Sequence, residues 1–335
     1  MGPTEELDDF LKIMSKLSEV LSGIEPKRKE IIQNLISEKR KSLPGKLYHY
    51  TNSNGIIGII QTNVLWATDF LSLNDKTELV YGASLLVEEL EQYGEEHNND
   101  ISVLLNKVSN FYKEHGDIYR SIFETYIISF SENTDMLSQW RAYSNNATGC
   151  CIEFDFTDSS LFTIVSESTP WALEELPIIY DKAIQRKQVR SGIDLILNYL
   201  NSTEWTVKKI ANSTETEQGT ILGLLIHVFE PFVIAFKHPG FSEECEWRAV
   251  ASCPSNLIVT KKKARIISTG SSNYLECLFI QSDNDNLWQR KLLPITGVKH
   301  GPLAKENVKE EIEKQLTLDG YESQVDYSDS SIPLK

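Results

Sequence analysis

The chain has 335 residues, of which 41% are hydrophobic and 24% charged, a composition typical of a globular protein with a buried core. Its formal net charge of -15 repels phosphate backbones and anionic lipid at long range, which argues against non-specific binding to nucleic acid or to a membrane. The five cysteines form no C-x-x-C pair and the histidines have no zinc-ligand spacing, so free thiols in a cytoplasmic protein are the simplest interpretation.

The first segment, residues 5–41, is expected to form two helices. Apolar residues recur with a period close to 3.6 from Phe10 to Leu21, and again from Ile31 to Ile36. The sequence "SGIEPK" between them offers Gly23 as a helix stop and Pro26 as the start of the next helix. We interpret residues 1–42 as a helical appendage that serves packing or self-association.

From Lys46 onward, short runs rich in β-branched and aromatic residues predict strands. Helical insertions are expected at about 76–115 and 186–235, and a last helix near the C-terminus. We therefore predict an α+β fold in which residues 43–335 form one domain with a mixed β core. No apolar run approaches the roughly 20 residues that span a membrane, and the N-terminus lacks a signal peptide, so no membrane association is expected. The polar tail beginning at Tyr327 carries Ile332, which could tie it to the core.

The common motifs of cofactor and metal chemistry are absent from the sequence. It contains no H-x-x-x-H, no EF-hand loop, no Walker loop, no G-x-G-x-x-G and no G-x-S-x-G. No metal is therefore expected, and a nucleotide would have to be held by another arrangement.

The first polar segment that draws attention is "LYHYT". Alternation along a strand places Leu47, His49 and Thr51 on one face and Tyr48 and Tyr50 on the other. A cleft-facing imidazole can donate a hydrogen bond to a ribose hydroxyl. The simpler alternative is a histidine that packs between tyrosines and bonds the backbone, and from this segment alone that alternative is favoured.

The second segment, "SQWRAY", follows the predicted strand "SFSE" and is expected to be helical. Arg141 could clamp a pyrophosphate with its forked guanidinium. Equally, it could pair with Glu132 and fix a turn. Ser131 and Trp140 are open to the same two interpretations.

The third segment is "EECEWR". The spacing of Glu244 and Glu246 predicts that both side chains lie on one face of a strand, with Arg248 on the same face as a charge partner. Paired carboxylates suit a site that stabilises positive charge on a sugar. A solvated edge strand is the alternative, but the apolar residues around Trp247 favour a buried strand, where an unpaired carboxylate costs stability.

Together, these segments resemble a widespread bacterial family of unknown function. The resemblance covers about Lys46 to the C-terminus and rests on at least six ordered segments: Y-H-Y-T, L-W-A-T, L-N-D, S-F-S-E, W-R-x-Y, C-I-E-F-D and E-x-E-W-R. The two predicted N-terminal helices lie outside it.

A more distant resemblance connects the strand–helix–strand segment from His49 to Trp66 with ADP-ribosyltransferases, including the DarT-like DNA-modifying toxins and the poly-ADP-ribose polymerases. It implies an ADP-ribosyltransferase-like β core and NAD as substrate. His49 would then hold the adenine-side ribose, and Trp66 or Tyr81 would stack on nicotinamide. The E-x-E spacing is similar to that of arginine-modifying members, in which Glu244 would orient the acceptor and Glu246 would be catalytic.

The resemblance also implies roles for residues around these positions. Arg141 would neutralise the pyrophosphate, and Glu153 competes with Glu246 for the role of the late glutamate. The remaining residues that the resemblance places at the nucleotide site are Tyr50, Thr51, Asn74, Asp75, Ser131 and Trp140.

The function expected from the resemblance is that of an NAD-dependent ADP-ribosyltransferase or NAD glycohydrolase that needs no metal, by analogy a bacterial toxin or phage-defence effector. The acceptor could be a protein, a nucleic acid, a small molecule or water. The first alternative is a non-catalytic module that senses a nucleotide, with the N-terminal helices as its output. The second is a protein-interaction module in which the same motifs only determine turns.

Overall fold

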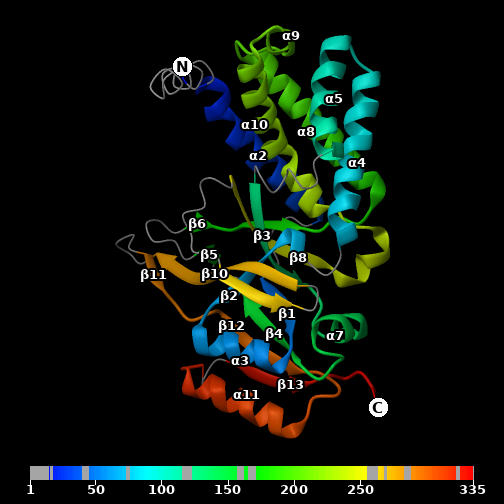
Figure 1. The fold of residues 1–335 in the computed structure, drawn as a ribbon. Helices are drawn as coiled ribbons and strands as arrows, with labels where there is room; N and C mark the ends of the chain where they lie inside the picture. Colours follow the sequence, from blue (N-terminus) through cyan, green and yellow to red (C-terminus); the bar gives the residue numbers. More distant parts are fainter. Residues whose placement is uncertain are drawn as a thin grey trace. The chain divides into compact units, whose positions relative to one another are not determined.

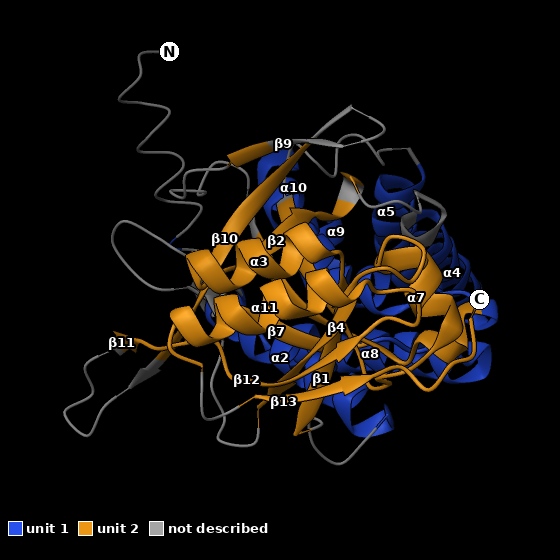
Figure 2. Cartoon of the chain, turned by 90° about the horizontal axis from the view of Figure 1, so that it is seen from below, with its two compact units in different colours: residues 1–41, 75–120, 178–240 blue, residues 42–74, 121–177, 241–335 orange. Residues whose placement is uncertain are grey.

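The structure is a computed structural model (Figure 1). It describes residues 15, 18–39, 45–72, 76–114, 123–156, 162–164, 171–254, 263–267, 270–282, 288–321 and 325–334. The chain divides into two compact units, coloured separately in Figure 2. Unit 1 contains residues 1–41, 75–120 and 178–240, and unit 2 contains residues 42–74, 121–177 and 241–335.

The described part of unit 1 is helical. Its helices are α2 (Ser18–Lys39), α4 (Lys76–Glu95), α5 (Asn99–Glu114), α8 (Lys182–Ser202), α9 (Val207–Ala211) and α10 (Glu215–Ala235). Both predicted helical insertions are thus confirmed as helical, and they share this unit with the N-terminal helix. The grouping follows from side-chain packing, because α2 and α4 both contact α10 and α8.

Helix α10 is the most apolar helix of the described chain. It begins with a capping box in which Thr214 and Glu217 satisfy each other's backbone amides, and it continues for 21 residues. That length and composition would allow it to cross a membrane, although no run of that size was expected from the sequence. Most of the helix is buried inside the unit, as is usual for a helix that is hydrophobic on all sides.

The expected break between two N-terminal helices is wrong, because α2 continues through Gly23 and Pro26. Gly23 lies against helix α8: a Cβ atom there would come within 2.0 Å of the Tyr199 hydroxyl oxygen. The glycine therefore permits close packing of two helices and does not end one. Further along α2, Arg28 forms a buried ion pair with Glu230 of α10.

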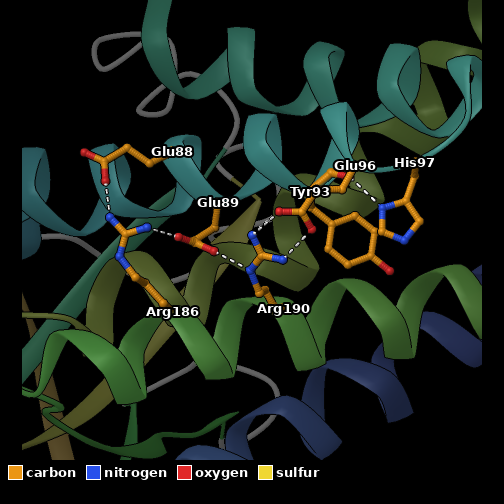
Figure 3. A network of polar contacts seen from close by, with 7 residues as sticks. All are labelled: Glu88, Glu89, Tyr93, Glu96, His97, Arg186 and Arg190. Carbon is orange, nitrogen blue, oxygen red and sulfur yellow. Dashed lines mark hydrogen bonds and ion pairs between the residues drawn. The ribbon is translucent and has the colours of Figure 1, made fainter.

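A network of charged side chains joins α4 to α8 (Figure 3). Glu89 of α4 is buried and accepts hydrogen bonds from Arg186 and Arg190 of α8. Arg190 also holds Glu96 through both terminal nitrogens, at 2.8 and 3.0 Å. One buried carboxylate is thus matched by two guanidinium groups, which compensate its charge.

All the strands that the structure describes belong to unit 2. They are β1 (Lys46–Thr51), β2 (Leu65–Asp69), β3 (Phe123–Ser131), β4 (Cys150–Asp155), β5 (Phe162–Ile164), β6 (Trp171–Ala172), β7 (Glu174–Pro177), β8 (Glu246–Pro254), β9 (Lys263–Ile267), β10 (Gly270–Ser282), β11 (Trp288–Arg290), β12 (Ile295–His300) and β13 (Asp326–Asp329). They form one sheet whose main path is β13-β12-β4-β1-β3-β2-β10-β5-β6; β8 pairs with β3, β7 pairs with β8, and β9 and β11 pair with β10. The α+β class and the mixed sheet are confirmed.

The described helices of unit 2 follow strands β1, β2, β3 and β12 along the chain. They are α3 (Ser53–Thr62), η1 (Phe70–Ser72), α7 (Leu137–Tyr143) and α11 (Glu306–Leu318), while η2 (Pro239–Glu244) begins in unit 1 and ends in unit 2 just before β8. Helix α3 begins at Asn52, whose side chain caps it, and packs beside α11 (Figure 1). The C-terminal tail is tied down as expected, because Ile332 packs against the cluster of Tyr50 and Trp140.

Candidate functional site

The sheet of unit 2 splits along one edge of β3. On its other edge, β3 pairs with β8 along its whole length, from Phe123 opposite Pro254 to Ser131 opposite Glu246. Along the split edge, β1 pairs with β3 only at Ser131, and β2 pairs only at Tyr126 and Ile127. Ser129 lies between these two contacts and is exposed, although its neighbours along the strand are buried. The divergence of β1 and β2 thus opens a local gap in the sheet at Ser129.

His49 closes part of this gap. Its Nδ1 lies 2.9 Å from the carbonyl oxygen of Ser129, and a carbonyl can only accept, so Nδ1 carries the proton. Burial lowers the pKa of His49 below its ordinary value, although the Ser129 carbonyl opposes that change. The imidazole is therefore neutral at pH 7, and Nε2 is left as a hydrogen-bond acceptor. The backbone bond expected from the sequence is confirmed, and the ring could accept from a hydroxyl at Nε2.

Glu246 opens strand β8 on the far side of β3. Only 6% of its surface is exposed, and Arg248 beside it is 2% exposed. The guanidinium holds the carboxylate at both oxygens, with Nε to Oε1 at 2.7 Å and Nη2 to Oε2 at 3.0 Å. The predicted pairing of Arg248 with Glu246 is confirmed, and the pair fixes the direction of the carboxylate.

The prediction that Glu244 and Glu246 share one face of a strand is wrong. Glu244 ends the 3-10 turn η2, and only Glu246 belongs to β8. Cys245 between them has a φ of 44°, a left-handed backbone that a non-glycine residue adopts only when its surroundings impose it. The turn is held by Ser131, whose hydroxyl donates to the Glu244 carbonyl oxygen at 2.7 Å.

Glu244 is directed toward helix α7. The Tyr143 hydroxyl donates to its Oε1 at 3.3 Å, and Tyr143 is itself exposed near the end of α7. Arg141 lies on the same helix and is also exposed. The Glu244 carboxylate and the Tyr143 phenol therefore lie together just before β8, whereas Arg141, two residues before Tyr143 on α7, is exposed on a different side of the helix.

The cross-strand register places Trp66 on the same face of the sheet as Glu246. Thr68 of β2 faces Ile127 of β3, so Trp66, two residues earlier, shares the face of Ile127 and Ser131. Ser131 in turn faces Glu246. Trp66 is 41% exposed and lies against Tyr274, with ring centroids 4.5 Å apart. An exposed aromatic surface is thus available on this face.

The side chain of His49 points to the opposite face of the sheet. Tyr48 faces Ser131 in the register, and His49, as its neighbour, alternates away. Its ring centroid lies 6.0 Å from that of Phe130, which is also turned away from Glu246. The imidazole of His49 therefore contacts Ser129 at the gap between β1 and β2, and it does not lie beside Glu246.

Two other predicted ligand contacts are buried in the turn between β3 and α7. Tyr50 donates to the Asn133 carbonyl oxygen at 3.0 Å, and burial raises the pKa of its hydroxyl far above the usual range. Trp140 is fully buried, and its Nε1 donates to Asp135 at 2.7 Å. Asp135 also receives hydrogen bonds from Ser330 and Ser331 of the tail. These side chains hold the turn, and their burial keeps them from a ligand.

The remaining predicted residues occupy different surroundings. Thr51 ends β1, with its hydroxyl close to Gly55 of α3. Glu153 accepts from Lys46 at 2.6 Å and from Thr296 at 2.8 Å; burial raises its pKa, but these bonds lower it overall. Tyr81 belongs to unit 1, where it donates to Gln185. Asn74 and Asp75 lie outside the described residues.

Sequence reasoning missed Ser129 and Tyr143. Ser129 is exposed only because two strands diverge beside it, and no local pattern reveals a divergence between distant strands. Tyr143 was part of the quoted "WRAY" but carried no signal of its own. In the described ranges, no three His, Cys, Asp or Glu side chains gather as a metal ion would require.

Comparison with known proteins adds one match. Residues 139–249 match a protein family described as "Protein of unknown function (DUF2971)". The matched range begins in α7 and ends in β8, so it includes Arg141, Glu244 and Glu246. Neither the curated proteins nor the solved structures contain a match.

Proposed function

We propose that the chain cleaves NAD, as an ADP-ribosyltransferase or an NAD glycohydrolase, at the split between β1 and β2. The proposal rests on the carboxylate of Glu246, which Arg248 holds in a fixed direction. It lies one strand away from the gap, where the neutral imidazole of His49 and the exposed indole of Trp66 are found. Strands β1 and β8 flank β3, so they are about 10 Å apart. An extended dinucleotide over the split could reach both.

Cleavage of the bond between nicotinamide and ribose passes through a sugar with oxocarbenium character. A carboxylate that is already oriented stabilises this charge without reorganising during the reaction. Arg248 would supply that orientation to Glu246. The carboxylate would also accept a hydrogen bond from the ribose 2′-hydroxyl.

The other residues of the site would position the two ends of the dinucleotide. The distal ribose would donate a hydroxyl hydrogen to Nε2 of His49, reversing the direction expected from the sequence. Trp66 would offer its exposed ring to the flat nicotinamide. Arg141 would meet the pyrophosphate. Glu244, next to Tyr143, would direct the acceptor.

The experiment is to incubate the protein with NAD and to measure released nicotinamide by chromatography. Glu246→Gln should reduce the rate by about 10²- to 10³-fold, the usual cost of removing one group that stabilises transition-state charge. Glu243→Gln is the matched control, because Glu243 is an exposed neighbour in η2. Equal loss in both variants would contradict the proposal.

A second candidate is a nucleotide-sensing module without catalysis. It is favoured by one observation: both oxygens of Glu246 are already engaged by Arg248. In that case NAD would bind the wild type and the Glu246→Gln variant with similar affinity in calorimetry, and no nicotinamide would be released. A measurement of binding beside turnover therefore separates the two candidates.

If turnover is found, the same variant addresses the biological role. A toxin or phage-defence effector of this class should lower the NAD content of the cell that expresses it. Expression of the wild type should therefore deplete cellular NAD, while Glu246→Gln should not. Unchanged NAD with an active purified enzyme would indicate transfer to a specific acceptor and not bulk cleavage.

A further inference from the structure

Residues 131–136, which we call the β3–α7 loop, hold the carbonyl groups just before Glu246. The Ser131 hydroxyl donates to the Glu244 carbonyl oxygen at 2.7 Å, and the backbone amide of Glu132 donates to the Cys245 carbonyl oxygen at 3.1 Å. The two bonds therefore fix the peptide units on both sides of Cys245, where the left-handed backbone turns the chain into β8. The loop thus helps to set the direction in which Glu246 enters the strand.

The β3–α7 loop is braced by further hydrogen bonds as far as Asp135. The backbone amide of Asn133 donates to the Ser131 hydroxyl oxygen at 3.0 Å. The Tyr50 hydroxyl donates to the Asn133 carbonyl oxygen at 3.0 Å and accepts from the Met136 amide at 3.2 Å. A series of hydrogen bonds thus connects the surroundings of Asp135 to the carbonyl groups before β8.

Asp135 joins this loop to the C-terminal tail, residues 330–334. Its Oδ1 accepts from Nε1 of Trp140 at 2.7 Å and from the Ser330 hydroxyl at 2.6 Å. Its Oδ2 accepts from the Ser331 amide at 2.8 Å and from the Ser331 hydroxyl at 2.9 Å. Each oxygen therefore faces one N–H group that can only donate. Only a carboxylate, which has two acceptor oxygens, satisfies both of these groups.

Apolar contacts and charge also favour the docked position of the tail. Ile332 and Leu334 pack against the cluster of Tyr50 and Trp140. Partial burial raises the pKa of Asp135, but the hydrogen bonds from the tail serines and from Trp140 lower it overall. The docked tail and the ionised carboxylate therefore stabilise each other.

We propose that the docked tail helps to position Glu246, and that Asp135 is the positioning residue through which it acts. While the tail is docked, the β3–α7 loop is held against the turn before β8, and the Glu246 carboxylate keeps its direction. When the tail is released, Asp135 loses the three hydrogen bonds that the tail donates, and the loop loosens. The effect on catalysis rests on the proposed function, whereas the coupling between tail and loop does not.

Hydrogen exchange measures this coupling without any ligand. Asp135→Asn keeps the shape of the side chain, but its NH₂ group must face either Nε1 of Trp140 or the Ser331 amide. We expect the amides of Glu132 and Asn133 to exchange about tenfold faster or more, because charge-assisted hydrogen bonds that hold the loop are lost. The amides of β4 should keep their exchange rates, which separates loosening of the loop from general unfolding.

Asp329→Asn is the matched control. Asp329 lies in β13, just before the tail, but it pairs with Lys309 of α11 at 2.8 Å and is 65% exposed. Its replacement should leave the exchange of the loop amides unchanged. The double variant Ser330→Ala/Ser331→Ala removes the hydroxyl bonds from the tail side and should change exchange in the same direction as Asp135→Asn. The double variant Ser330→Thr/Ser331→Thr keeps both hydroxyls and should exchange like the wild type.

Nicotinamide release adds the catalytic readout. Asp135→Asn should lower kcat about tenfold and change KM by less than about twofold, because Glu246 acts in the transition state. Asp329→Asn should change neither. Faster exchange confined to the tail, or an unchanged kcat in a variant whose loop amides exchange faster, would overturn the proposal. Absence of release by the wild type would instead contradict NAD cleavage, and the exchange rates would still decide the coupling.

Discussion

At the scale of single residues, the geometry of His49 changes the role that its sequence suggested. The sequence allowed His49 to donate a hydrogen bond to a ribose, but the single N–H of the neutral ring already donates to the Ser129 carbonyl oxygen. What remains is an acceptor, and its availability depends on the ring staying neutral. The direction of one hydrogen bond could not be read from "LYHYT", because Ser129 comes from a strand 80 residues away.

This geometry predicts the pH dependence of NAD binding. The pKa of His49 lies below its ordinary value of 6.5, so Nε2 remains an acceptor from pH 8 down to at least pH 6.5. NAD affinity should be constant over that range and should fall at lower pH, when Nε2 gains a proton. His49→Phe should weaken NAD binding about fivefold to tenfold, the cost of one hydrogen bond. It should also abolish the fall of NAD affinity at low pH. Calorimetry from pH 5 to pH 8 measures both effects.

An affinity for NAD that rises on acidification would contradict this assignment, because it would require a protonated imidazole facing the ligand. Titration of the His49 ring by NMR identifies the group responsible. His300 is the necessary comparison, since burial lowers its pKa as well and neither of its ring nitrogens has a hydrogen-bond partner among the residues that the structure describes. The two resonances therefore have to be assigned separately.

The carboxylates show where residue-level prediction succeeded and failed. Spacing alone was enough to predict that Arg248 pairs with Glu246, because residues two apart on a strand share a face. The same rule failed for Glu244, since Cys245 turns the chain with a left-handed backbone before the strand begins. The surrounding turn imposes this backbone conformation, and the residue types in the sequence do not predict it.

At the scale of elements, most strands and helices follow from local periodicity. The strands containing His49, Trp66, Ser131 and Glu153 lie where β-branched and aromatic runs predict them. The helix stop at Gly23 and Pro26 was misread, because both residues also occur where close helix packing requires them. The split along β3 depends on the register of three distant strands, which no local pattern contains.

The junction of α4 and α8 depends on the buried Glu89. Glu89→Gln should lower the free energy of unfolding by about 2 kcal/mol, because two guanidinium groups lose their shared carboxylate. This loss is below the roughly 3–5 kcal/mol usual for a fully buried ion pair, because Arg186 and Arg190 are 34% and 32% exposed and water screens them. Urea denaturation followed by circular dichroism measures the change.

Glu88→Gln is the matched control for Glu89, one residue earlier on the same helix. Glu88 also pairs with Arg186, at 2.8 Å, but its side chain is 53% exposed. Its removal should change stability by no more than about 0.5 kcal/mol. Similar losses in the two variants would show that burial does not decide the strength of this network.

The turn after α7 depends on close backbone packing at Gly149. A Cβ atom there would come within 2.2 Å of the Thr51 carbonyl oxygen, at the end of β1. Gly149→Ala should therefore destabilise the protein by about 2 kcal/mol or more and displace the turn. Gly58→Ala in α3 is the control, because nothing lies within 4 Å of its Cβ position. It should stabilise the helix by up to about 1 kcal/mol. Thermal denaturation of both variants tests the contrast, and two changes of the same sign would contradict it.

At the scale of the whole molecule, the chain combines a helical unit with a sheet unit that carries every described residue of the proposed site. The family match from 139 to 249 includes the segments of both units that lie between α7 and β8. The order of predicted strands and helices indicated the α+β class, and the net charge argued against non-specific contact with nucleic acid. They could not predict that the helical insertions and the N-terminal helix form one unit, because that grouping depends on packing between segments far apart in sequence.

Nicotinamide release from NAD is the most direct measure of NAD cleavage by Glu246. Wild type, Glu246→Gln and Glu243→Gln are compared at equal concentration, after calorimetry has shown whether each binds NAD. We predict release by the wild type and Glu243→Gln, and a loss of about 10²-fold or more in Glu246→Gln with NAD binding retained. Tight NAD binding by all three proteins without any release of nicotinamide would contradict it and would identify the site as a nucleotide sensor.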